Sequence, residues 1–328
     1  MSGKLNNIKN RFLPIPENVS KGLESEPKIT DFIILKELGS GSKGRTYLVQ
    51  HKVTKAEYAI KAIDKRDRKN FDENFKEKVE LIYKIHHPNI TKLFSFFEDN
   101  NYCYFIMEYL SKGDAGFVFH IDKSKRLSSK CCSSIIKDII SAIYYLHNIN
   151  PPIIHGYIKP QNILLSDGFV AKLTDFLNNY IPEEDDGRKA IGINNLRMQM
   201  QYLSPEIIEG KKYYKDKGDD IWSIGVLLFM LVTSKIPFQG DDYDSIKENI
   251  LKLKICWPKN INSDAKDLIV KILKPEKRLS LEEMIKHPFI TKNFPDAHKY
   301  LIKPEQSSSY KPFIICKDDP KTWNPEIL

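Results

Sequence analysis

The sequence of 328 residues predicts an α+β fold in which a strand-rich part precedes a helix-rich part. Short apolar runs, rich in β-branched and aromatic residues, occupy residues 32–109 and are separated by turn residues, as is typical of strands. Longer segments with apolar residues at helical spacing follow Gly113. Polar, proline-containing segments lie at both ends, where we expect extensions rather than core.

The strand-rich part begins at Phe32 with two strands around a glycine-rich turn. The expected strands are Phe32–Leu35, Thr46–Val49, Tyr58–Ile63, Thr91–Glu98 and Tyr102–Tyr109. Between the third and fourth strands, Phe75, Val79, Ile82 and Ile85 have helical spacing, which predicts a helix over residues 75–85.

The helix-rich part contains four segments with apolar periodicity. We expect helices over Ser129–Leu146, Asp219–Thr233, Asp264–Leu273 and Leu281–Lys286. From Asn293 the composition becomes polar, with several prolines and serines, and it predicts a tail rather than a core element.

Composition narrows the class of protein. The apolar content of 41% is that of a soluble globular protein, and the first residues contain no apolar signal segment. The longest apolar run, Ile221–Val232, is too short to span a bilayer, so we expect no membrane partner. Five scattered cysteines fit a reducing compartment and predict a cytoplasmic protein, with cytoskeletal or nuclear association left open.

The net charge of +8 is spread along the chain rather than gathered in one arm. An ordinary solvated surface explains it, with attraction to an acidic partner as the alternative, and we expect no nucleic-acid partner.

A glycine-rich stretch runs from Leu38 to Thr46 and contains Gly39, Gly41 and Gly44. Glycines make simple turns, but they also let backbone N–H groups approach phosphates. The strand Tyr58–Ile63 that follows carries Lys61, which is read either as a solvated lysine or as a phosphate ligand.

The stretch that organises the chain is Ile154-His155-Gly156-Tyr157-Ile158-Lys159-Pro160-Gln161-Asn162-Ile163-Leu164. It resembles the catalytic loop H-R-D-x-x-x-x-N of eukaryotic protein kinases. Other kinase-like motifs follow in order, namely Thr174-Asp175-Phe176-Leu177, Ser204-Pro205-Glu206, Asp220–Gly225 and His287–Ile290. Within that family, His87–Ile90, Ile207–Gly210, Trp222–Val226 and Arg278–Ile290 look most like the Aurora branch of Ser/Thr kinases.

The resemblance implies a two-lobed protein kinase fold, with a β-rich N-lobe over residues 31–107, a hinge at 108–113 and an α-helical C-lobe over 114–292. Residues 1–30 are then a polar extension and residues 293–328 a C-terminal tail. Arg278 is the expected partner of Glu206, and Asp220 is expected to anchor the catalytic loop.

The family's ligands are ATP and Mg²⁺, and the resemblance implies where each would bind. The nucleotide would contact Leu38, Gly39, Gly41, Gly44, Thr46, Ala59, Lys61, Met107, Glu108, Leu110, Asp114 and Leu164. Asn162 and Asp175 would bind the metal. Asp114 is equally well explained as a surface loop residue.

Several positions depart from the family pattern. Tyr157 stands where an aspartate would accept the proton of the substrate hydroxyl, although Lys159 is retained. Gly156 replaces the arginine before it, and Leu177 replaces the glycine of D-F-G. Lys78 stands where a glutamate would pair with Lys61. The expected function is therefore that of a pseudokinase, which is a protein-interaction, scaffolding or allosteric module that binds ATP without transferring phosphate.

Two alternatives remain open. One is an atypical active Ser/Thr kinase, because Lys61, Asn162 and Asp175 survive. The other is a nucleotide-free structural component of a larger, for example cytoskeletal, assembly. It is motivated by the apolar strip Tyr310–Cys316 inside the polar tail, which predicts either docking on a protein partner or docking on the chain's own domain.

Overall fold

The computed structural model describes residues 10–12, 28–41, 44–66, 73–116, 127–175, 200–211, 216–275, 277–304 and 313–315. These residues form two compact units, which are considered separately. One is built on a β-sheet and the other is mostly helical, and the chain passes from the first to the second after Tyr109. The turn His87–Ile90 belongs to the helical unit.

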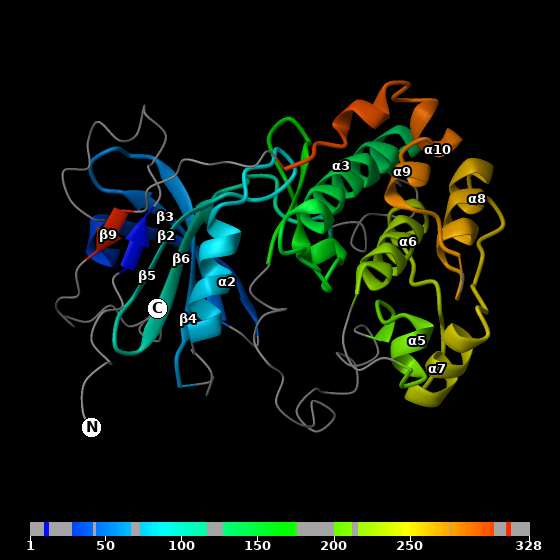
Figure 1. Ribbon diagram of the computed structural model, residues 1–328, viewed down its shortest axis with the longest axis horizontal. Coiled ribbons are helices and arrows are strands. Elements are labelled where there is room, and N and C mark those ends of the chain that lie inside the picture. Colours follow the sequence, from blue (N-terminus) through cyan, green and yellow to red (C-terminus); the bar gives the residue numbers. More distant parts are fainter. Residues whose placement is uncertain are drawn as a thin grey trace. The chain divides into compact units, whose positions relative to one another are not determined.

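The first unit is an antiparallel sheet with the strand order β2-β3-β4-β6-β5-β1-β9 (Figure 1). Its strands are β1 (Asn10–Phe12), β2 (Phe32–Gly41), β3 (Gly44–His51), β4 (Glu57–Asp64), β5 (Leu93–Glu98), β6 (Tyr102–Glu108) and β9 (Phe313–Ile315). A short 3₁₀ helix, η1 (Ile29–Asp31), precedes β2, and helix α2 (Glu73–Tyr83) packs on the sheet at β5.

Aromatic side chains fill the core on one face of this sheet. Tyr47, Tyr104 and Ile60 are fully buried there, together with Val49 and Tyr58. The ring of Tyr104 stacks on Phe97 with centroids 4.8 Å apart. Burial is nearly continuous along β4 and β6, which agrees with the short apolar runs from which these strands were predicted.

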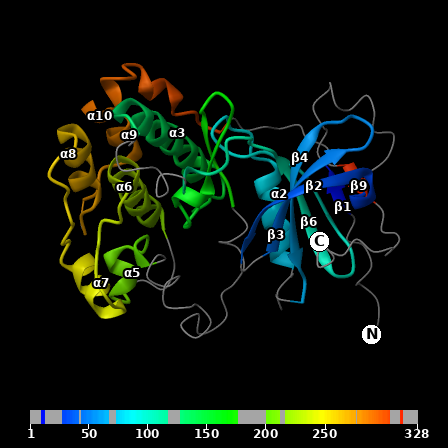
Figure 2. The same ribbon diagram turned by 180° about the vertical axis from the view of Figure 1, so that it is seen from behind.

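The second unit contains the helices and a short hairpin. Its elements are α3 (Ser129–Asn148), η3 (Pro160–Asn162), β7 (Ile163–Leu165), β8 (Ala171–Leu173), α5 (Pro205–Ile208), α6 (Lys217–Thr233), α7 (Tyr243–Leu251), α8 (Ser263–Ile272), α9 (Leu281–Met284), α10 (Pro288–Thr291) and η5 (Ala297–Tyr300). Helix α6 lies between α3 and α8 in both views (Figures 1 and 2). Among the described residues, the helices include none that is long and apolar enough to cross a membrane.

Helix α6 is the buried centre of this unit, and its sequence explains both its start and its position. Asp216 caps the helix by accepting from the N–H of Gly218, and Asp219 returns a bond to the N–H of Asp216. A Cβ on Gly225 would lie 2.7 Å from Ile272, so the glycine lets α8 approach closely. The helix is apolar on nearly all sides, as expected for a helix that is buried on all sides.

The α+β class is confirmed, with a β-rich part followed by a helical part, and the expected strands and helices are present with ends shifted by up to six residues. Hairpin β7–β8 and helix α7 were missed, because three-residue strands and a short polar helix leave little periodicity.

The segment that was predicted to be a tail is structured in its first part. Residues 293–304 continue the helical unit along α3, with Ala297 fully buried. Further on, β9 pairs with β1, placing Phe313 opposite Phe12. Part of the apolar strip Tyr310–Cys316 thus lies against the chain's own sheet, and the remainder of that strip lies outside the described residues.

Candidate functional site

The glycine-rich stretch forms the end of the β2–β3 hairpin. Gly39 lies opposite Thr46, and Gly41 lies opposite Gly44. Leu38 is 39% exposed, and Ile33 and Leu35 of the same strand are exposed to a slightly greater degree. A Cβ on Gly39 would meet nothing within 4 Å, so packing within the described chain gives no reason for a glycine at this position.

Gly44 has a structural reason of its own. Its φ is +135°, which side chains rarely adopt, and a Cβ would lie 2.2 Å from the carbonyl oxygen of Ala62. Any other residue would therefore push β3 away from β4. Close packing is sufficient to explain this glycine, without a phosphate.

The strands next to this hairpin carry the other sheet residues of the predicted nucleotide site. In the β3–β4 register Thr46 lies opposite Lys61, and in the β4–β6 register Ala59 lies opposite Met107. Lys61 is partly buried, and Glu108 accepts from the N–H of Lys92 at 3.3 Å. The sheet therefore brings Gly39, Thr46 and Lys61 into one lateral row.

Helix α2 was expected to present Lys78 toward Lys61. Val79 and Ile82 are buried, and Glu77 is exposed. The side chain of Lys78 lies outside the described set, so its expected position facing Lys61 stays a prediction.

The residues of the predicted site that belong to the helical unit include Leu110, Asp114 and Leu164. Asp114 and Leu164 form an isolated antiparallel bridge, and Leu110 is buried. The carboxylate of Asp114 accepts from the N–H of Gly116 at 2.7 Å. This contact explains Asp114 as a loop-stabilising residue and uses one of the oxygens that a ribose would need.

The catalytic-loop sequence is anchored by a single buried carboxylate. Asp220, at the start of α6, accepts from the N–H of His155 at 2.9 Å and from the N–H of Gly156 at 2.6 Å. It also contacts Nε2 of His147 at 2.8 Å. The expected anchoring role of Asp220 is confirmed. The contact of His147 was not predicted, because its only signal in the sequence is its place at the end of a helix preceding the loop.

Gly156 has a φ of +64°, a conformation that costs a side-chain-bearing residue about 1 kcal/mol or more. The glycine therefore relieves backbone strain at the position where the family pattern has arginine. The ring of His155 is fixed as well, with Nε2 2.9 Å from the carbonyl oxygen of Thr174.

Tyr157 and Lys159 lie beside each other on this loop. The N–H of Tyr157 donates to Nδ1 of His155 at 3.2 Å, and its carbonyl oxygen accepts from Nδ2 of Asn162 at 2.8 Å. The ammonium of Lys159 is 5.2 Å from the centroid of the Tyr157 ring, within the range of a cation–π contact. The tyrosine thus fits a loop whose backbone is held by hydrogen bonds on both sides of this position.

Asn162 and Asp175, the predicted metal ligands, lie at the same end of the β7–β8 hairpin. Ile163 pairs with Leu173, and the N–H of Thr174 donates to the carbonyl oxygen of Asn162 at 3.0 Å. Because Nδ2 of Asn162 donates to Tyr157, the amide oxygen is the atom that would coordinate a cation. One carboxylate and one amide oxygen suit Mg²⁺ better than a soft metal.

Asp175 has a φ of +71°, which is rare for a residue other than glycine. Strained backbone of this kind concentrates at functional sites, so Asp175 is a stronger candidate than its sequence motif alone indicated. Among the described residues, His, Cys, Asp and Glu form no group of three suited to a metal. Residues 176–199, with Phe176 and Leu177, lie outside the described set.

The segment after residue 199 is held firmly. Arg278 forms two hydrogen bonds to Glu206, at 2.7 and 2.9 Å, as predicted. Burial raises the pKa of Glu206, but the hydrogen bonds and charge of Arg278 outweigh this and hold the pKa below its usual value. Ser204 donates to Asp219 of α6 at 2.5 Å, so α5 is attached to the same central helix.

These arrangements agree with comparisons to known proteins. The protein kinase domain family matches residues 32–290. An Aurora kinase of Saccharomyces cerevisiae is 36% identical over 81% of this chain and 71% of its own length. An Aurora kinase of Eremothecium gossypii is 34% identical over 82% of this chain and 71% of its own. Aurora kinase A-B of Xenopus laevis is 30% identical over 86% of this chain and 67% of its own length.

The match covers strands β2 to β6 of the sheet, the catalytic-loop sequence and the helices as far as α10, and the Aurora relatives agree with the branch expected from the motifs. The chain belongs to the protein kinase domain family and is related to Aurora kinases.

Proposed function

We propose that this chain is a pseudokinase that binds ATP and a protein partner without transferring phosphate. The observation that carries the proposal is Tyr157, which stands where the kinase catalytic loop supplies the aspartate that accepts the substrate proton. General-base catalysis contributes about 10²–10⁴-fold. A phenol, with an ordinary pKa of about 10, is protonated at neutral pH and cannot take that role.

The remainder of the loop supports binding rather than chemistry. Asp220 and His155 hold the backbone in place, and Asn162 and Asp175 keep the oxygen donors that a hard cation prefers. Lys61 lies opposite Thr46 in the sheet, where the family uses a lysine for the α- and β-phosphates. Bound Mg²⁺ would supply charge neutralisation for the phosphates, with Asn162 and Asp175 as its protein ligands.

The first test is a thermal-shift titration of the purified chain with ATP, with and without Mg²⁺. A ligand of the folded state stabilises it by RT ln(1 + [L]/Kd), so binding gives a saturable rise in melting temperature. Lys61→Ala should weaken the response, while Lys52→Ala, which changes an exposed lysine after β3, should leave it unchanged. If ATP gives no change in melting temperature, nucleotide binding is excluded. The remaining function is then binding of a protein partner, as a nucleotide-free structural component.

An atypical active Ser/Thr kinase is the second candidate, favoured by the strained Asp175 beside Asn162. Positioning and charge neutralisation account for much of phosphoryl transfer, so the loss of the base need not abolish it. Steady product formation with Mg-ATP that is lost in Lys61→Ala would replace our proposal with this one. A blank assay at high protein concentration would eliminate it.

A further inference from the structure

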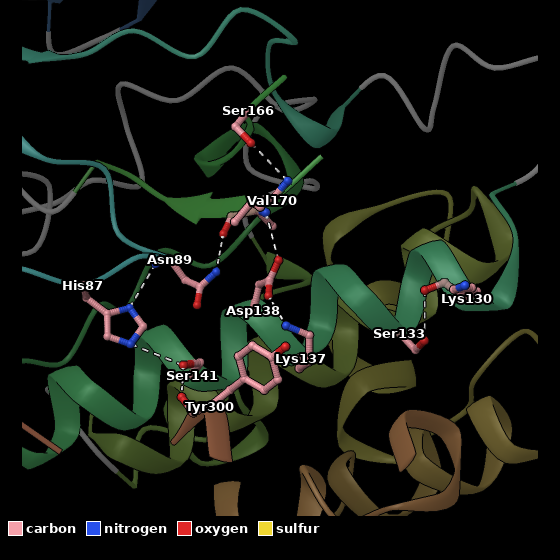
Figure 3. Close-up of polar contacts among 11 residues, drawn as sticks. His87, Asn89, Lys130, Ser133, Lys137, Asp138, Ser141, Ser166, Val170 and Tyr300 are labelled. Carbon is pink, nitrogen blue, oxygen red and sulfur yellow. Dashed lines mark hydrogen bonds and ion pairs between the residues drawn. The ribbon is translucent and has the colours of Figure 1, made fainter. Parts of the chain in front are cut away.

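Strand β8 leads directly to Asp175, and its edge away from β7 is held by the turn His87–Ile90 and by a side chain of α3. Asp138 of α3 accepts from the N–H of Ala171 at 3.0 Å, and Nδ2 of Asn89 donates to the carbonyl oxygen of Ala171 at 3.1 Å. The N–H of Leu173 donates to the carbonyl oxygen of Asn89 at 2.8 Å. Figure 3 shows Asn89 and Asp138 converging on this strand.

Asp138 is almost completely buried, and its charge is compensated by its neighbour on the helix. The ammonium of Lys137 lies 2.5 Å from Oδ1 of Asp138, and both side chains are 6% exposed. Burial raises the pKa of Asp138, and Lys137 acts against that rise. A buried carboxylate that lost this partner would tend to become protonated, and a protonated acid is a weaker acceptor for the N–H of Ala171.

Lys137 is in turn covered by the segment that follows α10. Its ammonium lies 3.8 Å from the ring centroid of Tyr300 and 5.4 Å from that of Phe294. Ser141, one turn further along α3, donates to the carbonyl oxygen of Tyr300 and lies 3.3 Å from Nε2 of His87. Figure 3 shows the Tyr300 ring beside Lys137, so the C-terminal segment contacts the same polar cluster that holds β8.

We propose that Asp138 is a positioning residue for the cation-binding end of β8, and that Tyr300 of the C-terminal segment controls it through Lys137. The aromatic ring shields the buried Lys137–Asp138 pair from water, and the carboxylate fixes Ala171 four residues before Asp175. Anything that lifts residues 293–300 from α3 therefore loosens the segment that carries Asp175. The part of this inference that concerns the cation rests on the proposed function, whereas the coupling of Tyr300 to β8 does not.

The test is amide hydrogen exchange of the full chain in the absence of ligand. Tyr300→Ala removes the ring, whereas Tyr300→Phe keeps it and loses only the hydroxyl. We expect Tyr300→Ala to accelerate exchange at Ala171 by roughly tenfold or more, the effect of losing a hydrogen bond to a charged group, and Tyr300→Phe to leave it unchanged. Lys137→Met should act like Tyr300→Ala, and Lys137→Arg should retain the wild-type rate.

A second readout separates positioning from general stability. In the ATP titration we expect Tyr300→Ala to lose most of the additional stabilisation that Mg²⁺ gives, while keeping the response to ATP alone. Exchange at Ala171 that is unchanged, or that rises equally in α8, would overturn the proposal. If the wild-type chain shows no response to ATP, the proposed function fails, and the exchange experiment still decides the coupling. Tyr300 is 45% exposed, so its substitution should be tolerated even if Lys137→Met does not fold.

Discussion

At position 157 the hydrogen bonds to the rest of the loop are made by the backbone, and the side chain is the part that departs from the kinase pattern. The backbone of Tyr157 makes hydrogen bonds to His155 and Asn162, and any residue type except proline could make them. Only the side chain differs in kind from a carboxylate. The loop can therefore keep its conformation while it loses the group that would accept a proton.

Restoring the carboxylate tests this interpretation. We expect Tyr157→Asp to raise phosphate transfer from Mg-ATP by up to about 10²-fold over the wild-type chain, at the lower end of what a general base contributes. Tyr157→Phe, which removes only the hydroxyl, should leave the wild-type rate unchanged. The measurement is the initial rate of transfer to a general protein substrate. A wild-type activity that falls in Tyr157→Phe would show instead that the phenol participates.

His87 is another residue whose surroundings determine its chemistry. It is buried in the helical unit, where Nδ1 accepts from the N–H of Asn89 at 3.1 Å. Burial, together with the charge of Lys172, lowers the pKa of His87 from 6.5 to about 4. The folded chain therefore keeps this imidazole neutral at a pH where the unfolded chain would protonate it.

This difference predicts a loss of stability in acid. Between pH 6.5 and 4 the unfolded state binds the additional proton, so the free energy of unfolding should fall by about 3 kcal/mol over that interval because of His87. In His87→Gln this part of the pH dependence should disappear, although the variant is less stable at neutral pH. His86→Gln is the control, because His86 is the neighbouring histidine and is exposed. Equal pH profiles in urea unfolding for the two variants would contradict the assignment.

At the scale of elements, α6 organises the helical unit. Asp219 and Asp220 in its first turn hold Ser204 ahead of α5 and the backbone of the catalytic loop, respectively. Arg278, which precedes α9, holds α5 through Glu206 and lies 5.3 Å from the ring of Trp222 in α6. Three separate segments therefore depend on one helix.

The Glu206–Arg278 pair should contribute measurably to stability because both side chains are largely buried. We expect Arg278→Leu to lower the free energy of unfolding by about 3 kcal/mol at pH 7, since it leaves a carboxylate without its partner. Arg278 depresses the pKa of Glu206, so this stabilisation is present above the ordinary pKa of glutamate and is lost as the pH falls through the folded-state value.

Chemical denaturation at pH 7 and at pH 3 provides the measurement, with a smaller difference between wild type and Arg278→Leu expected in acid. Lys252→Leu is the matched control, because its ion pair with Glu248 is exposed and should matter little. A penalty that does not change with pH would mean that packing on Trp222, rather than charge, explains the effect.

For the whole molecule, the two units differ in how they are completed. The helical unit closes with residues 293–304 on α3, while the sheet gains β1 and β9 from the two ends of the sequence. Strand β1 pairs with β9 over three residues but with β5 only at Phe12 and Ser95. Ordering the two ends of the chain costs conformational entropy, and the few backbone pairs formed by β1 and β9 offset little of it. These strands therefore add little local stability.

Hydrogen exchange should therefore be graded across the chain. We expect amides of α3 and α6, which are buried, to exchange only by global unfolding, and those of β1 and β9 to exchange by local opening at much faster rates. Peptide-level exchange measured by mass spectrometry distinguishes the two classes. Strands β4 and β6, which pair over seven residues, are the internal control within the sheet. Protection of β9 equal to that of β6 would contradict this expectation.

Elements that depend on the local sequence could be predicted, whereas elements that depend on contacts with distant segments could not. The longer helices and strands were visible in the sequence because their apolar residues extend over many positions, at helical spacing in the helices and as runs between turn residues in the strands. Hairpin β7–β8 was not visible, because each strand has three residues and is stabilised by Asn89 and Asp138 from distant segments. Of the site residues, the motif positions could be named in advance, but the contacts of His147 and Tyr300 could not.

The sequence by itself determined the family, the order of the longer strands and helices, and the identity of the residue at position 157, because motifs and apolar runs are local properties of the chain. Only the tertiary structure decided that Gly44 is required by the carbonyl of Ala62, that Asp175 has a strained backbone, and that Tyr300 covers Lys137. These depend on distances between residues far apart in sequence, which packing sets and no local pattern encodes.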